Sequence, residues 1–435
     1  MNIFKHIMLV GILSFINHQA YTATFKTEKW QTANGVQVIF YAAPEVPMLD
    51  ISLAFAAGSA YDGNLYGLSA LTNHLLNQGS HGKDAGVIAE ALAEHGAQFS
   101  AEVNRDMAIL NLRTLVTTDA LKQSINTFAE IINYPDFTQE ALTRERNQLL
   151  IAIEQSKESP EEIADLDFFA TLYKNHPYAH PVSGTSSTLK TITRSQIRNF
   201  YHTHYVGKNA TLVLVGAISS DKAHQISNTL TKHLPSGTAA AQIMPATPLA
   251  QSAMKSTDFP SSQTMIRLGQ VGIDHHNPDY FPLMVGNYIL GGGSLVSRLA
   301  VEIREKRGLT YGVDSQFTPM HGEGPFLISL STRTDQTDKA LNIIKSILHD
   351  YVATGPNDQE LAAAKSYLTG SFPLSLASNR SIATLLLRMN FYHLPDDYLD
   401  NYIKQINAVT KEEIQHAFHQ QINPDKLLLV TVGQS

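Results

Sequence analysis

The sequence predicts an α+β protein built from two homologous halves, each a mostly antiparallel sheet with helices packed on one side. One observation is that a strand-like alternating run followed by a helical segment occurs twice, roughly 200 residues apart. Another is that each half closes on a short β-rich run ending in glycine, at 211–216 and at 427–433. We expect the two halves to form a clam-like pair.

The composition supports a folded chain and excludes several classes of site. The chain has 435 residues, of which 43% are hydrophobic and 16% charged, enough apolar material for a sizeable core. The net charge of −7 provides no basic surface for nucleic acid. Because cysteine is absent, disulfides, thiolate nucleophiles and Cys-ligated metal sites are excluded.

Residues 1–23 are predicted to be a secretory signal peptide. A basic residue, Lys5, precedes an apolar run at 7–16 that is too short to span a bilayer, and small residues follow up to Ala23. The alternative is an uncleaved membrane anchor. We expect an exported protein with no membrane association after signal removal, periplasmic in a Gram-negative bacterium and secreted otherwise.

The first half is assigned to residues 24–234. Within it, the alternating run 107–115 predicts a strand, and the apolar spacing of 118–132 predicts an amphipathic helix. In the second half, residues 263–435, the corresponding strand and helix are expected at 325–332 and 337–348. Residues 235–262 are rich in Pro, Ala, Ser and Thr and are interpreted as a linker.

The helical stretch 67–79 carries the most informative motif. It resembles the zinc helix of the inverzincin metallopeptidases, the superfamily of pitrilysin, insulinase and the mitochondrial processing peptidase, whose motif is H-x-x-E-H. Residues i, i+3 and i+4 share one helix face, so two imidazoles can hold zinc beside a carboxylate that activates water. Here those positions are Ala70, Asn73 and His74, and only the last keeps a ligand side chain.

The resemblance also indicates where the third zinc ligand would lie. In the superfamily it is a glutamate seven residues after the glutamate of a Glu-Arg pair, which corresponds here to Glu145-Arg146 and places Ala152 at the ligand position. Glu154 lies on a different helix face. A catalytic zinc site takes three protein ligands plus water, so the resemblance implies a degenerate site with neither metal nor cofactor in this chain.

A second motif lies in the other half. Residues 290–311 resemble the most recognisable C-terminal segment of the superfamily, in which an arginine and a tyrosine seven apart contact substrate. The matching residues are Arg304 and Tyr311. A guanidinium and a phenol can both donate hydrogen bonds to a peptide carbonyl or its oxyanion. The alternative is that Arg304 is one of several charges on a solvated helix.

Together the motifs suggest the non-catalytic, substrate-binding subunit of an exported heterodimeric zinc metallopeptidase that degrades or processes peptides. The chain is expected to be inactive alone and to act with a homologous partner subunit that carries the zinc. Two alternatives remain. One is a stand-alone peptide-binding or architectural protein without a catalytic role, and the other is an active peptidase with an unrecognised site.

The histidine pairs are weaker candidates for metal binding. His275 and His276 are adjacent and would point to opposite faces of a strand. His416 and His419 lie three apart on an expected C-terminal helix, without an assignable carboxylate partner. For these pairs a surface or hydrogen-bonded polar role is favoured over metal binding.

Overall fold

The computed structural model describes residues 25–434. The predicted signal peptide, 1–23, therefore lies outside the described residues. Within 25–434, no helix combines the length and the apolar character needed to cross a lipid bilayer.

The first half forms a six-stranded sheet in the order β1-β2-β8-β3-β7-β6. Neighbouring strands are antiparallel except for the parallel pair β2–β8. The predicted strand 107–115 is β7, which alternates between buried and half-buried positions because one face covers the core. The strands are β1 (Thr27–Gln31), β2 (Gln37–Ala42), β3 (Met48–Phe55), β6 (Gln98–Val103), β7 (Ala108–Leu115) and β8 (Ala210–Gly216), with a separate small ribbon of β4 (Gly79–Ser80) and β5 (Lys83–Asp84).

The second half forms a five-stranded sheet in the order β11-β12-β10-β13-β9. It is antiparallel except for the pair β13–β9. Strand β9 lies inside the segment interpreted as a linker. It is an edge strand with mostly exposed side chains, so it shows no hydrophobic alternation that the sequence could reveal. The strands are β9 (Ala253–Asp258), β10 (Gln263–Val271), β11 (Val313–Phe317), β12 (Pro325–Arg333) and β13 (Leu428–Gly433).

Apart from α5 and α12, the helices of each half cover one face of that half's own sheet, which confirms the predicted α+β halves. The expected helix 118–132 is α3, and the expected helix 337–348 is α10, which continues for six further residues. In each, the residues at helical spacing are buried against the sheet of the same half. The helices of the first half are α1 (Leu68–Leu75), α2 (Ala85–Ala93), α3 (Thr118–Asn133), α4 (Gln139–Ser156), α6 (Ser186–Thr191), α7 (Arg194–His204) and α8 (Ser220–Thr231). Those of the second are α9 (Tyr280–Asn287), α10 (Thr337–Thr354), α11 (Asp358–Ser371), α13 (Tyr398–Ala408) and α14 (Lys411–Gln421).

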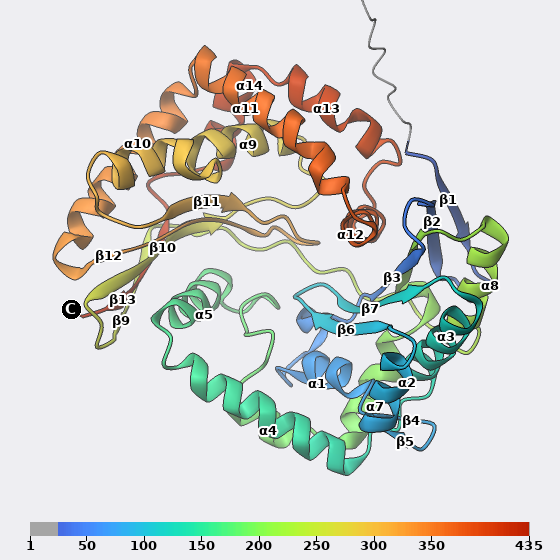
Figure 1. Ribbon diagram of the computed structural model, residues 1–435. Helices are drawn as coiled ribbons and strands as arrows, with labels where there is room; N and C mark the ends of the chain where they lie inside the picture. The colour runs from blue at the N-terminus through green and yellow to red at the C-terminus, as the bar shows by residue number, and fades with distance from the viewer. Residues whose placement is uncertain (1–24, 435) are drawn as a thin grey trace, which may run out of the picture.

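Two helices cross between the halves. Helix α5 (Pro160–Tyr173) follows the helices of the first half, yet it packs on β10 and β13 of the second sheet, on the side opposite α9, α10 and α14 (Figure 1). Conversely, α12 (Asn379–Phe391) packs on β3 and β8 of the first sheet. Each crossing helix has its own apolar cluster against the sheet it covers. The structure therefore consists of two sheet-centred bodies, each completed by a helix from the other half of the sequence.

Candidate functional site

Helix α1 carries the positions that correspond to a zinc helix, and its start is fixed by a buried carboxylate. Asp62 accepts hydrogen bonds from the backbone N–H groups of Gly67 and Ser69, both at 2.7 Å. Burial raises the pKa of Asp62 to about 7, although these bonds act in the opposite direction. Gly67 has φ of 93°, and a Cβ there would meet the backbone oxygen of Ser183 at 2.8 Å. The start of α1 is thus fixed by these two hydrogen bonds and by the close approach at Gly67.

The residue at the position of the general base is a structural amide. Asn73 is fully buried. Its Nδ2 donates to the backbone oxygen of Glu102 on β6 at 2.9 Å, and its Oδ1 accepts from the hydroxyl of Tyr205 at 3.1 Å. Asn73 therefore ties α1 to the edge strand of the sheet and to the end of α7. An amide cannot accept a proton from water, and this one is already engaged at both ends.

The other ligand positions provide almost no metal-binding chemistry. Ala70 is buried, and Ala152 is exposed on α4. His74 is half-buried, and burial lowers the pKa of its imidazole. Glu154 is exposed and engaged with Lys157 and Ser186. Across residues 25–434, no three His, Asp or Glu side chains are grouped so that they could hold a metal ion. The residues present do not fit a catalytic zinc ion.

In the second half, the structure leaves Arg304 and Tyr311 accessible. Arg304 lies on the short π-helix Ala300–Glu305 and is exposed, while Tyr311 has 86% of its surface exposed. Neither side chain makes a hydrogen bond or ion pair with another described residue. By contrast, the neighbouring Glu302 is engaged by Lys306 and Arg307. The donors of Arg304 and Tyr311 are therefore available to a ligand.

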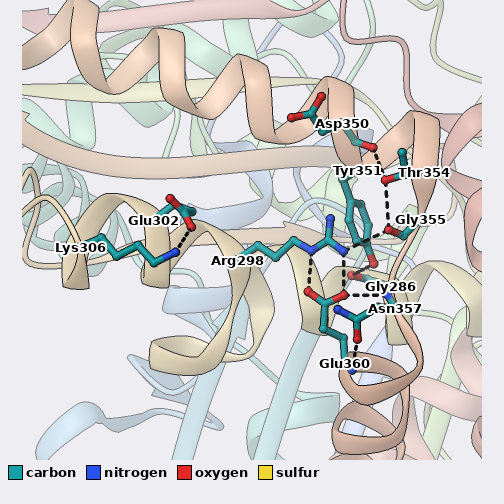
Figure 2. Close-up of polar contacts among 10 residues, drawn as sticks. All are labelled: Gly286, Arg298, Glu302, Lys306, Asp350, Tyr351, Thr354, Gly355, Asn357 and Glu360. Atoms are coloured by element: carbon teal, nitrogen blue, oxygen red, sulfur yellow. Dashed lines mark hydrogen bonds and ion pairs between the residues drawn. The ribbon is translucent and has the colours of Figure 1, made fainter.

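The segment that carries Arg304 is held in place by a contact that sequence reasoning missed. Arg298 donates two hydrogen bonds to the carboxylate of Glu360, at 2.6 and 2.7 Å, and a third to the backbone oxygen of Gly355 at 3.1 Å (Figure 2). Its guanidinium also lies 4.8 Å from the ring centre of Tyr351. The bonds to Glu360 are the main reason that the pKa of Arg298 is raised. This Arg298–Glu360 clamp fastens the segment onto α10 and α11.

The sequence contained a local pattern that pointed to Glu360, one of the two residues of this clamp. Asn357 and Glu360 form a capping box, in which each side chain accepts a hydrogen bond from the backbone N–H of the other (Figure 2). The spacing Asn-x-x-Glu predicts such a helix start. The partner Arg298 lies 62 residues away in the sequence, so local pattern could not supply it.

Comparison with known proteins agrees with the missing zinc-ligand side chains on α1 and α4. Residues 37–186 match the family model described as Insulinase (Peptidase family M16), and residues 191–368 match the model described as Peptidase M16 inactive domain. A solved structure of a peptidase M16 inactive domain from Pseudomonas fluorescens is 40% identical in sequence, with a TM-score of 0.91 over 94% of this chain and 98% of that chain. This chain belongs to peptidase family M16.

Curated relatives within the family carry contrasting names. A Helicobacter pylori protein described as a non-peptidase homolog, YmxG, is 28% identical over 407 residues, covering 89% of this chain and 90% of the relative. A Rickettsia felis protein described as an uncharacterized zinc protease is 28% identical over 336 residues, covering 77% of this chain and 80% of the relative. With the substitutions on α1 and α4, this M16 member is of the inactive, peptidase-like type. The predicted membership of the insulinase-like superfamily is confirmed.

Proposed function

We propose that this chain is the non-catalytic, substrate-binding subunit of an exported heterodimeric zinc metallopeptidase. The observation that carries the proposal is the asymmetry between the halves. The face of α1 that would hold zinc is filled by the internally bonded Asn73, whereas Arg304 and Tyr311 are exposed with their donors unused.

In this proposal, the second half binds an extended peptide through hydrogen bonds. Arg304 supplies a charged planar donor and Tyr311 a phenolic donor, and both suit a peptide carbonyl or the oxyanion that forms on it. A homologous partner subunit supplies the zinc and its activated water, so this chain holds no cofactor. Export rests on the N-terminal pattern at 1–23, which directs the complex to the periplasm of a Gram-negative bacterium or to the exterior of another cell.

The first experiment combines zinc analysis with a peptide-cleavage assay on the purified mature chain. We expect metal near zero and no cleavage. Co-expression with a zinc-bearing M16 subunit from the same organism should then create peptidase activity. A tightly bound zinc ion with turnover in the isolated chain, abolished by His74→Ala, would instead establish a peptidase with an unrecognised site.

The role of the exposed pair is tested in the active complex. Arg304→Ala and Tyr311→Phe should each lower kcat/KM by several-fold or more, because each removes a donor to the reacting carbonyl. Arg380→Ala, at another exposed arginine without a hydrogen bond, is the matched control and should leave turnover unchanged. If Arg304→Ala cleaves peptides as fast as the control does, the assigned role is wrong.

A stand-alone peptide-binding role is the second candidate, because β6 and β11 are edge strands with a neighbouring strand on one side only. One backbone oxygen of each is already bonded to a side chain, Glu102 to Asn73 and Ser315 to Asn287. Such an edge can accept an extended peptide as an additional strand. Fluorescence anisotropy with labelled peptides and the isolated chain separates the two candidates. Tight binding without a partner, together with no activity on co-expression, would favour this binding role. An architectural role predicts neither binding nor activity.

A further inference from the structure

A completely buried carboxylate lies where the two halves meet. Asp106, in the turn between β6 and β7, is 1% exposed. Its Oδ1 accepts from the hydroxyl of Tyr178 at 2.6 Å, and its Oδ2 accepts from the hydroxyl of Tyr392 at 2.9 Å and the backbone N–H of His321 at 3.0 Å. A buried charge is tolerated only with such partners. These three come from segments that are far apart in the sequence.

The crossing helices determine what these bonds connect. We define the first body as the first sheet with its own helices and α12, and the second body as the second sheet with its own helices and α5. Asp106 and Tyr392, which caps α12, belong to the first body. Tyr178 packs in the apolar cluster of α5, and His321 lies between β11 and β12, so both belong to the second. Two of the three bonds therefore cross between the bodies.

A second contact crosses at the same place. The guanidinium of Arg105 lies 3.6 Å from the ring centre of Phe169 on α5, and its Nε donates to the backbone oxygen of Tyr178 at 3.0 Å. Most apolar residues packed with α12 and with α5 form two different clusters, and Leu399 on α13 also contributes to the α12 cluster. At Asp106 and Arg105 themselves, the contacts between the bodies are hydrogen bonds and a cation–π contact.

Two histidines of the second body face this joint. The ring of His275 stacks on Tyr392 with 3.8 Å between ring centres, and its buried Nε2 has no hydrogen-bond partner. Burial, followed by the charges of Arg388, His321 and His276, lowers the pKa of His275 to about 3.

The ring of His321 packs near Phe391 and Tyr392, with ring centres 5.0 and 5.1 Å apart. Burial lowers its pKa, His393 and His276 act in the same direction, and Asp106 acts against them. The two rings thus face three further groups that are positive or can become so: Arg388, His276 and His393. Asp106 counteracts their effect on the pKa of His321.

We propose that Asp106, His275 and His321 form a pH-responsive latch that holds the two bodies together at neutral pH and releases them in acid. A proton on His275 would place a cation in a buried site beside Arg388, and a proton on the half-buried His321 would add a second cation near His276 and His393, opposed by Asp106. When the bodies separate, the rings regain water and their ordinary basicity. Protons therefore bind the open form more tightly as the pH falls below about 6.5. The size of the effect follows from His275 alone, whose pKa is about 3 in the closed form and about 6.5 once the ring regains water. Lowering the pH from 7.5 to 5.0 then shifts the equilibrium toward the open form roughly 30-fold.

The test measures the distance between the bodies directly. The chain has no cysteine, so Val87→Cys on α2 and Met254→Cys on β9 provide two exposed labelling sites, one on each body. Pulsed electron resonance of the spin-labelled protein should give one narrow distance at pH 7.5 and a second, longer population at pH 5.0. Far-UV circular dichroism must show the same folded content at both values. The readout needs no peptidase partner, so it is independent of the proposed function.

Four variants test whether Asp106 holds the bodies together and whether His275 produces the response to pH. Tyr178→Phe keeps the ring but removes the hydroxyl that donates to Asp106 across the two bodies, and Asp106→Asn replaces one of the two acceptor oxygens by an NH2 group that faces a donor. Both should raise the longer-distance population already at pH 7.5. His275→Phe keeps the stacked ring without a titrating nitrogen and should reduce the response to pH 5.0, whereas His416→Gln, at an exposed histidine, should respond like the parent. A parent distribution that does not change between the two pH values, or a His275→Phe response equal to that of the parent, would overturn the proposal.

Discussion

Replacing Asn73 by alanine tests whether the residue at the general-base position holds the first half together. The substitution leaves two groups without their partner, the buried hydroxyl of Tyr205 and the backbone oxygen of Glu102. Tyr205 is 1% exposed, so water cannot replace the lost acceptor without disturbing the core. With about 1 kcal/mol for each lost hydrogen bond and about 1–3 kcal/mol for a stranded buried group, we expect a loss of about 2–4 kcal/mol.

The assay is urea unfolding followed by the fluorescence of Trp30. This is the single tryptophan of the chain, it lies on β1, and its ring centre is 3.9 Å from that of His224 on α8, so it reports on the first half. The free energy of unfolding should fall while the slope with urea stays constant. The matched control is Asn228→Ala on an exposed face of α8, which should change stability by less than about 0.5 kcal/mol.

The result that refutes this reasoning is an Asn73→Ala protein as stable as the control. A second variant separates a structural from a catalytic interpretation of the position. Asn73→Glu restores the acidic residue type of an active zinc helix, yet it directs a carboxylate toward the backbone oxygen of Glu102. We expect lower stability and no gain of peptidase activity, because Ala70 and Ala152 still lack ligand atoms.

Three further outcomes follow from the structure. Arg298→Ala should destabilise the second half by about 2 kcal/mol, because it breaks the charge-assisted bonds to Glu360, and differential scanning calorimetry should show this in the corresponding transition. Burial depresses the pKa of His275 to about 3, so its contribution to stability is complete above pH 6.5 and is lost as the pH falls toward 3. Urea titrations at pH 5 should therefore show a loss of up to about 2 kcal/mol, absent in His275→Phe. Zinc added in excess and then removed by gel filtration should leave the same low residual metal in the parent and in His74→Ala.

The sequence alone determined the fold class and the regular elements with strong local patterns. Helices α3 and α10 were predicted because their apolar residues recur at helical spacing, and β7, β8, β12 and β13 because they alternate or are continuously apolar. Strand β9 was missed, since an exposed edge strand shows no such period. The motif positions Ala70, Asn73 and Ala152 were also read from sequence, because the loss of a ligand side chain is visible without coordinates.

Only the tertiary structure decided what replaces the missing site and how the halves are joined. The partners of Asn73 lie 29 and 132 residues away, and the hydrogen-bond partners of Asp106 lie 72, 215 and 286 residues away. The exchange of α5 and α12 between the sheets is equally non-local. Local periodicity specifies which face of a helix is apolar but not which sheet will cover that face. The choice among distant partners is made by packing and by the need to satisfy buried polar groups.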